Sequence, residues 1–221
     1  AATNADRAVA DMRHIFDDKS VNAVVIASCD HWHAPAAILA CKAGKHVYVE
    51  KPGSHNLREG RMMVDAARKH DVVMQHGTQS RSNQSKQAAV AMLREGAIGG
   101  VLVAKHVNSQ KRANIGHQQP SKPPDHLDYD LWVGPAQWRD YNPKIHPRRW
   151  RAFREFSNGQ TGDLCVHFFD VVRQHLGLGW PRSISASGGI LMRDPDSQIN
   201  THDTQTALFD YGDVQVVWNQ R

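Results

Sequence analysis

The sequence predicts an α/β protein, in which part of a doubly wound parallel sheet is followed by an α+β domain with an open, mainly antiparallel sheet. Apolar runs typical of buried strands alternate with helical patterns over residues 23–79, which is the order of a right-handed parallel β-α-β-α-β unit. Beyond residue 160 one helical pattern is followed by several strand patterns. A chain of 221 residues has room for one or two domains. We place them at residues 1–80 and 81–221.

Apolar periodicity and helix-start and helix-stop residues define the elements of the first domain. A helix is expected to begin near Pro35 and to stop before Gly44. Asn56 and Glu59 form a variant of the capping box at the start of another helix. The first strand is apolar throughout, which predicts burial on both of its faces. Strand patterns occupy residues 23–28, 46–50 and 72–75, and helical patterns occupy residues 5–17, 36–43 and 57–67.

The second domain begins with a helix and a strand and then loses its periodicity. Residues 110–160 hold most of the prolines and little regular pattern, and so long an irregular segment is usually functional or disordered. Its tryptophans and tyrosines favour order. We expect helices at 85–95 and 161–176, and strands at 101–107, 183–191, 204–211 and 214–218.

Composition excludes several classes of partner. The net charge is +5, but the basic residues are scattered, whereas a nucleic-acid site would be dense and one-sided. The most apolar run, residues 23–29, is far shorter than the ~20 residues of a membrane span. We therefore predict no nucleic-acid partner and no membrane partner.

The cysteines and the N-terminus bear on the compartment. Cys29, Cys41 and Cys165 are far apart and odd in number, so we interpret them as reduced, packed thiols. The first residues lack the pattern of an export signal. A cytoplasmic location is favoured, and export is the alternative because a removed signal would leave no trace.

Polar segments follow two of the predicted strands. Residues 28–33 read Ser-Cys-Asp-His-Trp-His, and residues 50–52 read Glu-Lys-Pro. Ligands of open α/β sheets bind beyond the carboxyl ends of the strands, so both segments are candidates for a binding site. Asp30, His31 and His33 could instead ligate zinc. The cysteines lack metal-binding spacing, and we predict no metal site.

A second constellation lies on the helix predicted at 161–176. Asp163, His167, Asp170 and Gln174 follow at i, i+4, i+7 and i+11 and would share one stripe beside an apolar stripe. Histidine, whose reference pKa is about 6.5, is suited to proton transfer near neutrality. Two structural alternatives stay open: Asp163 could serve the helix dipole, and His167 could be an ordinary half-buried histidine.

Together these segments resemble the Gfo/Idh/MocA family, the glucose-fructose oxidoreductases and inositol dehydrogenases. The resemblance rests on the strand that ends in a His-containing turn, on the segments A-G-K-H-V at 43–47 and E-K-P at 50–52, and on three further segments at 77–81, 131–136 and 162–167. It implies a Rossmann-like domain that binds NAD or NADP, and an oxidoreductase that removes hydride from a hydroxyl of a sugar or polyol.

The resemblance also implies roles for single residues. The catalytic set would be Lys51, Asp163 and His167: Lys51 at the reacting oxygen and the cofactor ribose, Asp163 holding the substrate, and His167 as general acid or base. The expected cofactor contacts are Ser28, Asp30, His31, His33, Glu50, Lys51, Pro52 and Gln79. The expected substrate contacts are Arg81, Arg149, Trp150 and Asp170. Four aromatic residues, Trp132, Trp138, Tyr141 and Trp150, could line a sugar site, anchor a long loop or form an oligomer contact.

The chain departs from the family in one respect. It contains no strand followed by a G-x-G-x-x-G turn, the usual pyrophosphate site. We therefore expect a fragment that lacks the first half of the dinucleotide domain and part of the second sheet, and that binds NAD(H) weakly by itself. Two rival functions are a glycoside hydrolase that oxidises its substrate transiently with NAD, and a non-catalytic truncated domain. We also expect a homo-oligomer formed through the C-terminal sheet.

Overall fold

The computed structural model describes residues 6–110, 114–192 and 194–221, and the chain divides into two compact units. The first comprises Ala1–Gly77 and Pro124–Trp138, and the second comprises Thr78–Pro123 and Arg139–Arg221. The segment Pro124–Trp138, which the sequence places after the domain boundary, therefore packs with the first unit.

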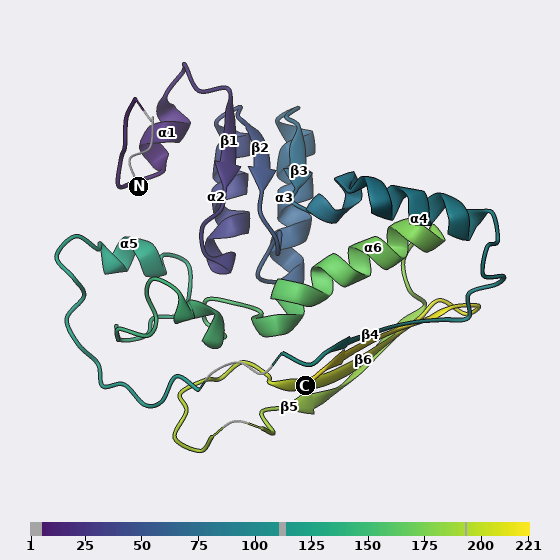
Figure 1. Ribbon diagram of the computed structural model, residues 1–221. Coiled ribbons are helices and arrows are strands. Elements are labelled where there is room, and N and C mark those ends of the chain that lie inside the picture. Colours follow the sequence, from purple (N-terminus) through teal and green to yellow (C-terminus); the bar gives the residue numbers. More distant parts are fainter. Residues whose placement is uncertain (1–5, 111–113, 193) are drawn as a thin grey trace. The chain divides into compact units, whose positions relative to one another are not determined.

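The first unit is built on a parallel sheet of three strands in the order β1-β2-β3 (Figure 1). The strands are β1 (Ala23–Ile26), β2 (His46–Val49) and β3 (Met74–His76), joined by the helices α2 (Asp30–Lys42) and α3 (Leu57–Lys69). A core packs both helices against the sheet and includes Ile26, Val49, Ala37 and Met63. The predicted β-α-β-α-β order is confirmed.

The expectation that the first strand is buried on both faces is wrong. Side chains alternate along a strand, and those of Val24 and Ile26 face the core with the two helices. Val25 points to the opposite face and is 74% exposed. Because both connecting helices pack on one side of the sheet, the other side receives no cover from them.

Helix α2 begins earlier than the sequence predicts. Pro35 is its sixth residue rather than part of its first turn, and Cys29 precedes the helix in extended conformation. Proline lacks an N–H group, and at the sixth position, just beyond the first turn whose N–H groups are unpaired in any helix, this removes one intrahelical hydrogen bond. The Asp-His-Trp-His segment is therefore helical, and this places its side chains against the protein interior.

The other helix signals of the first unit behave as expected. The side chain of Asn56 accepts a hydrogen bond from the Glu59 N–H at 3.0 Å, and the Glu59 carboxylate accepts one from the His55 N–H at 3.1 Å. Gly44, with φ of 73°, follows the end of α2. The N-terminal helix α1 covers only Arg13–Asp17 of the predicted 5–17, and Ala5 lies outside the described residues.

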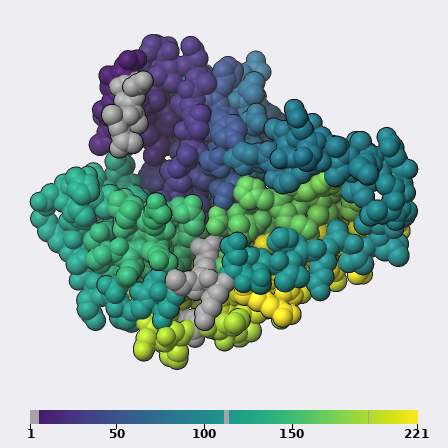
Figure 2. Space-filling view, in the orientation of Figure 1, coloured from purple at the N-terminus to yellow at the C-terminus, as the bar shows by residue number. Residues whose placement is uncertain are grey.

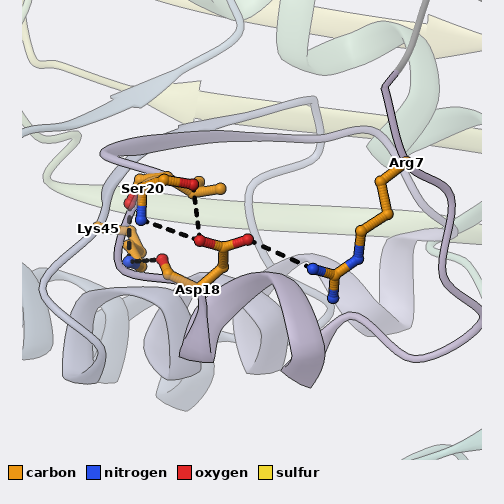
Figure 3. Close-up of polar contacts among 5 residues, drawn as sticks. Arg7, Asp18, Ser20 and Lys45 are labelled. Carbon is orange, nitrogen blue, oxygen red and sulfur yellow. Dashed lines mark hydrogen bonds and ion pairs between the residues drawn. The ribbon is translucent and has the colours of Figure 1, made fainter.

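Lys45, in the A-G-K-H-V segment, has a structural role in the first unit (Figure 3). It is 4% exposed, and its Nζ donates to the carbonyl oxygens of Asp18 and Val21 at 2.6 and 2.7 Å. The Asp18 carboxylate in turn accepts hydrogen bonds from Ser20 and lies 3.5 Å from Arg7. Lys45 therefore fixes the loop between α1 and β1 to the turn before β2.

Substituting Lys45 with methionine should destabilise the protein, although the methionine side chain fills much of the space of the lysine stem. The partly buried carbonyl groups of Asp18 and Val21 lose a charged donor, which should lower the free energy of unfolding by roughly 1 to 3 kcal/mol. Chemical denaturation of the complete protein measures this effect. Lys42→Met, at an exposed position of the same turn, is the control. Equal stability of the two variants would contradict the structural role.

The second unit is built on a sheet of four strands in the order β4-β7-β6-β5. The strands are β4 (Val103–Asn108), β5 (Ser183–Gly189), β6 (Thr204–Asp210) and β7 (Gln215–Gln220). Only the β4–β7 pair is parallel, so the predicted mainly antiparallel sheet is confirmed. In Figure 2 the yellow surface of the C-terminal residues borders the teal surface of the segment that holds β4.

Helices cover one face of this sheet (Figure 1). The helix α6 (Val166–Leu176) packs through Phe168 and Phe169 on Ala207 and Trp218 of the sheet. The helix α4 (Gln84–Arg94) packs in turn on α6. It matches the predicted helix at 85–95.

Between residues 114 and 160 the structure describes only short helices, α5 (Tyr129–Val133) and the 3-10 turn η2 (Arg149–Ala152). Aromatic side chains anchor the segment: Tyr129, Tyr141 and Trp150 are buried, whereas Trp138 is 57% exposed. Of the four aromatic residues for which the sequence leaves the role open, Tyr141 and Trp150 are therefore loop anchors, whereas Trp132 is half-buried.

Gly134, in the L-W-V-G-P-A segment at 131–136, allows the backbone to pass close to the ring of Trp32. Gly134 follows α5 with φ of 49°, and a Cβ atom at this position would collide with the ring of Trp32. Both residues belong to the first unit, and the indole N–H of Trp32 donates to the carbonyl of Trp132 at 3.0 Å. This contact fixes the segment 124–138 to α2. Within the described ranges no helix is long and apolar enough to cross a membrane.

Candidate functional site

The carboxyl ends of the three parallel strands form one edge of the first unit. The Glu50 N–H donates to the Ile26 carbonyl, and the Gly77 N–H donates to the Val49 carbonyl, both at 2.8 Å, so the chain segments that leave β1, β2 and β3 lie side by side. Ser28 is exposed here, and Glu50 and Lys51 are half-buried. This edge therefore presents a hydroxyl, a carboxylate and an ammonium group.

Three of the expected cofactor contacts lie beneath this edge rather than on it. Asp30, His31 and His33 are 3%, 2% and 2% exposed, because they belong to the first turn of α2. The ring nitrogens of His33 lie 2.6 Å from the carbonyl oxygen of Pro52 and 3.0 Å from that of Ser28. His33 thus joins the loop after β1 to the loop that carries Lys51, and we expect it to position Lys51.

The second histidine of the pair serves the segment 124–138. Nε2 of His31 lies 3.0 Å from the carbonyl oxygen of Trp132, and the ring of His31 meets that of Trp132 edge to face, 5.6 Å away. Both imidazoles therefore have backbone carbonyls as partners. Among the described residues no group of three histidine, cysteine or acidic side chains is arranged to hold a metal ion.

The helix that carries the second constellation begins with a π turn. Residues Thr161–Cys165 form the π turn η3, and α6 continues from Val166. A π turn holds more residues than an α turn, so the stripe predicted from α-helical spacing is broken between Asp163 and His167. The two side chains line different cavities of the second unit. Single π turns inside helices are frequent at functional sites.

His167 is half-buried in the wall of a cavity of about 560 Å³. Lys86 and His106 share this wall. The Lys86 ammonium donates to the Ser80 hydroxyl at 2.7 Å, and the ring of His106 stacks on those of Phe168 and Trp218. An imidazole on a rigid helix, next to open space and a cation, is suitably placed for proton transfer to a bound hydroxyl.

Asp163 lines a neighbouring cavity of about 450 Å³ together with Arg148, Arg149 and Arg151. Nε of Arg151 lies 3.8 Å from the Asp163 carboxylate. Gln110 lines both this cavity and that of His167, so the two hollows adjoin within the second unit. Arg149 is exposed, whereas Trp150 is 5% exposed and lies beneath the guanidinium of Arg151 at 4.1 Å.

Two of the expected substrate contacts bind each other. Arg81, in the 3-10 turn η1 (Gln79–Ser82), donates to both carboxylate oxygens of Asp170 on α6, at 2.7 to 2.9 Å. Hydrogen bonding to Asp170 raises the pKa of the Arg81 guanidinium. This ion pair fixes η1 to α6. Gln79 is exposed at the start of the same turn.

Several residues around the cavities are not singled out by any predicted motif. Arg148 and Arg151 flank the predicted Arg149, and their clustering in P-R-R-W-R is a signal that could have found them. Lys86, His106 and Gln110 belong to no motif of this sequence. Only the pairing of strands and the packing of α4 and α6 bring them together.

Cys165 lies between Asp163 and His167, but its thiol is unsuited to chemistry. Burial raises its pKa to about 12, which leaves a thiolate fraction of about 10⁻⁴ at pH 8. Burial also raises the pKa of Cys41, whereas Cys29 is only half-buried. All three are free thiols, as the sequence predicts.

We expect a thiol reagent at pH 8 to label Cys29 well before Cys41 and Cys165. The reason is that the two buried thiols are protonated and covered until the protein unfolds. Peptide mapping of the labelled complete protein, with and without denaturant, identifies each site. Labelling of Cys165 in the native protein at the rate of Cys29 would show that the thiol is accessible and ionised.

Comparison with known proteins agrees with this architecture. Residues 1–78 match the sequence model of the Gfo/Idh/MocA oxidoreductase family, NAD-binding Rossmann fold, and residues 104–188 match that of the family's C-terminal alpha/beta domain. A levoglucosan dehydrogenase of Pseudarthrobacter phenanthrenivorans is 35% identical over 173 residues, which are 78% of this chain and 37% of that protein. A myo-inositol 2-dehydrogenase of Thermotoga maritima is 26% identical over 98% of this chain and 54% of that protein.

Solved structures share the fold. The WlbA dehydrogenase of Bordetella pertussis, crystallised with NADH and UDP-GlcNAcA, superposes with a TM-score of 0.72 at 21% identity, over 97% of this chain and 52% of that one. The fold and the two matched sequence models thus define a Rossmann-type α/β protein of an oxidoreductase family. The chain belongs to the Gfo/Idh/MocA family. It spans between about a third and a half of the length of the two curated relatives described.

Proposed function

We propose that the complete protein oxidises a hydroxyl group of a sugar or polyol with NAD or NADP as hydride acceptor. The observation that carries this proposal is His167, a half-buried imidazole in the wall of a cavity about 560 Å³ in volume. A cavity of this size accommodates a monosaccharide. Curated relatives named levoglucosan dehydrogenase and myo-inositol 2-dehydrogenase support a substrate of this class.

The residues at the carboxyl edge of the first sheet fit a dinucleotide. The Ser28 hydroxyl is exposed, and Glu50 and Lys51 are half-buried, so they offer an alcohol, an acceptor and a cationic donor for ribose hydroxyls and the nicotinamide end. When bound, the dinucleotide would accept the hydride. His33, Asp30 and His31 support this edge from below, and Gln79 is a further candidate contact.

Each catalytic residue has a distinct task in the proposal. A carbinol carbon gives up hydride only as its hydroxyl loses a proton, and His167 accepts that proton as general base. Lys51 donates a hydrogen bond to the oxygen and stabilises its developing negative charge. Asp163 accepts hydrogen bonds from the other hydroxyls of the substrate and orients it. Arg149 is a candidate substrate contact, and the ion pair of Arg81 with Asp170 supports the helix that carries His167.

Product analysis tests the proposed reaction. The complete protein is incubated with NAD or NADP and a panel of hexoses, anhydrosugars and inositols, and both the reduced nucleotide and the sugar product are quantified. Stoichiometric reduced nucleotide and ketone are expected. Release of a sugar from a glycoside without net reduction would support the rival hydrolase. Tight nucleotide binding without turnover of any sugar would contradict the proposal.

A further inference from the structure

Three arginines converge on the cavity that Asp163 lines. Arg148, Arg149 and Arg151 contribute guanidinium groups to a hollow of about 450 Å³, and Asp163 is the one acidic residue among its described lining residues. The hollow also has apolar walls, because Ile115 and Ile199, 4% and 9% exposed, line it. Its volume lies within the range of small-molecule sites.

One of the three guanidiniums has partners in the protein. Arg151 lies 4.1 Å over the ring of Trp150, and its Nε is 3.8 Å from the Asp163 carboxylate. This pair offsets the negative charge of Asp163. The other two arginines, Arg148 and Arg149, are exposed, and neither forms an ion pair within the described part of the chain. Within the described residues the cavity therefore retains two positive charges, those of Arg148 and Arg149, that no carboxylate pairs with.

The chemistry of these groups selects the ligand. A guanidinium presents a planar fork of donors that matches a carboxylate or a phosphate, and two of them can hold one anion from both sides. We infer that this cavity binds an anionic substituent of the substrate, so that the sugar is a sugar acid or a sugar phosphate rather than a neutral sugar. This inference rests on the proposed function and deepens it.

The position of the cavity agrees with such a subsite. Gln110 lines both the arginine-rich cavity and the cavity of His167, so an anion held by Arg148 and Arg149 leaves the ring of the same molecule in reach of Gln110. Asp163 is negatively charged, so it would repel the anion and accept hydrogen bonds from ring hydroxyls. The subsite would thereby fix which end of the sugar faces the arginines and which faces Asp163.

Matched ligands test the inference on the complete protein. Affinities for D-glucuronate and D-glucose 6-phosphate are compared with that for D-glucose, and inositol monophosphate with myo-inositol, by calorimetry in the presence of NAD(H). We expect one charged class to bind about 10- to 100-fold tighter than its neutral counterpart, and the preference to weaken as salt is added. The uronate and the phosphate arms show which anion is preferred.

Charge-removing variants locate the effect. Arg148→Gln combined with Arg149→Gln should abolish the preference for the charged ligand, whereas Arg154→Gln, at an exposed position outside the cavity lining, should preserve it. Equal affinity of the intact protein for charged and neutral ligands overturns the inference, as does a preference that survives in the double variant. Turnover of neutral sugars in either of those cases would leave the proposed function standing, whereas absence of any sugar oxidation would remove both.

Discussion

Replacing His167 with alanine is expected to lower kcat of the complete protein by about 10² to 10⁴-fold, the usual contribution of a general acid or base. Thermal stability should change little, because His167 lines a cavity and is only half-buried. The matched control is His126→Ala, which removes an exposed imidazole from the first unit. It should leave both rate and stability unchanged.

The pH dependence distinguishes a base from a structural histidine. A protonated imidazole cannot accept a proton, so oxidation by the unmodified protein should slow as the pH falls below neutrality. In His167→Ala this acid limb should disappear, and added imidazole should restore part of the rate. A melting temperature that collapses on substitution, with the acid limb retained in the residual activity, would mark His167 as structural instead.

Replacing Lys51 with methionine should lower kcat by about 10² to 10³-fold, the range found when a group that stabilises a developing oxyanion is removed. Methionine retains much of the aliphatic stem, so the half-buried position stays filled. Lys69→Met, at an exposed position at the end of α3, controls for the loss of a positive charge. Lys51→Arg should recover only part of the rate, because a guanidinium is larger and differently shaped.

A double variant tests whether the two residues serve one chemical step. If Lys51 and His167 act on the same hydroxyl, the combined substitution should cost about as much as the larger single one, since residues that act as a unit are strongly non-additive. Fully multiplicative losses would show that they act in separate steps. Unchanged turnover in Lys51→Met would remove Lys51 from the catalytic set.

Local signals were sufficient for most of the secondary structure. The apolar runs at β1 and β2, the cap at Asn56 and the glycine stop at Gly44 each depend on neighbouring residues, and the structure agrees with them. The start of α2 differs from the prediction because Pro35, a strong helix-start signal, lies at the sixth position of this helix. The consequence was functional, since three residues assigned to the cofactor are buried.

In the candidate site, too, local patterns predict some positions, whereas tertiary contacts set the partners. The strand-end position of Lys51 and the helical position of His167 followed from the sequence alone, because strand order and helical periodicity are local properties. The ion pair of Arg81 with Asp170 joins residues 89 positions apart in the chain. His33 contacts the carbonyl of Pro52, which lies 19 positions further along the chain. No pattern in the chain predicts such partners.

The family, the order of the elements and the residue types that carry chemistry all follow from patterns in the chain. Which polar groups are available to a ligand depends instead on the packing of distant segments. That packing buries His31 and His33 and turns Lys45 inward onto two carbonyls, and it gathers Arg148, Arg149 and Arg151 around Asp163. The physical reason is that periodicity fixes which face of an element is apolar, whereas the exposure and charge of a polar side chain depend on what packs against it from distant parts of the chain.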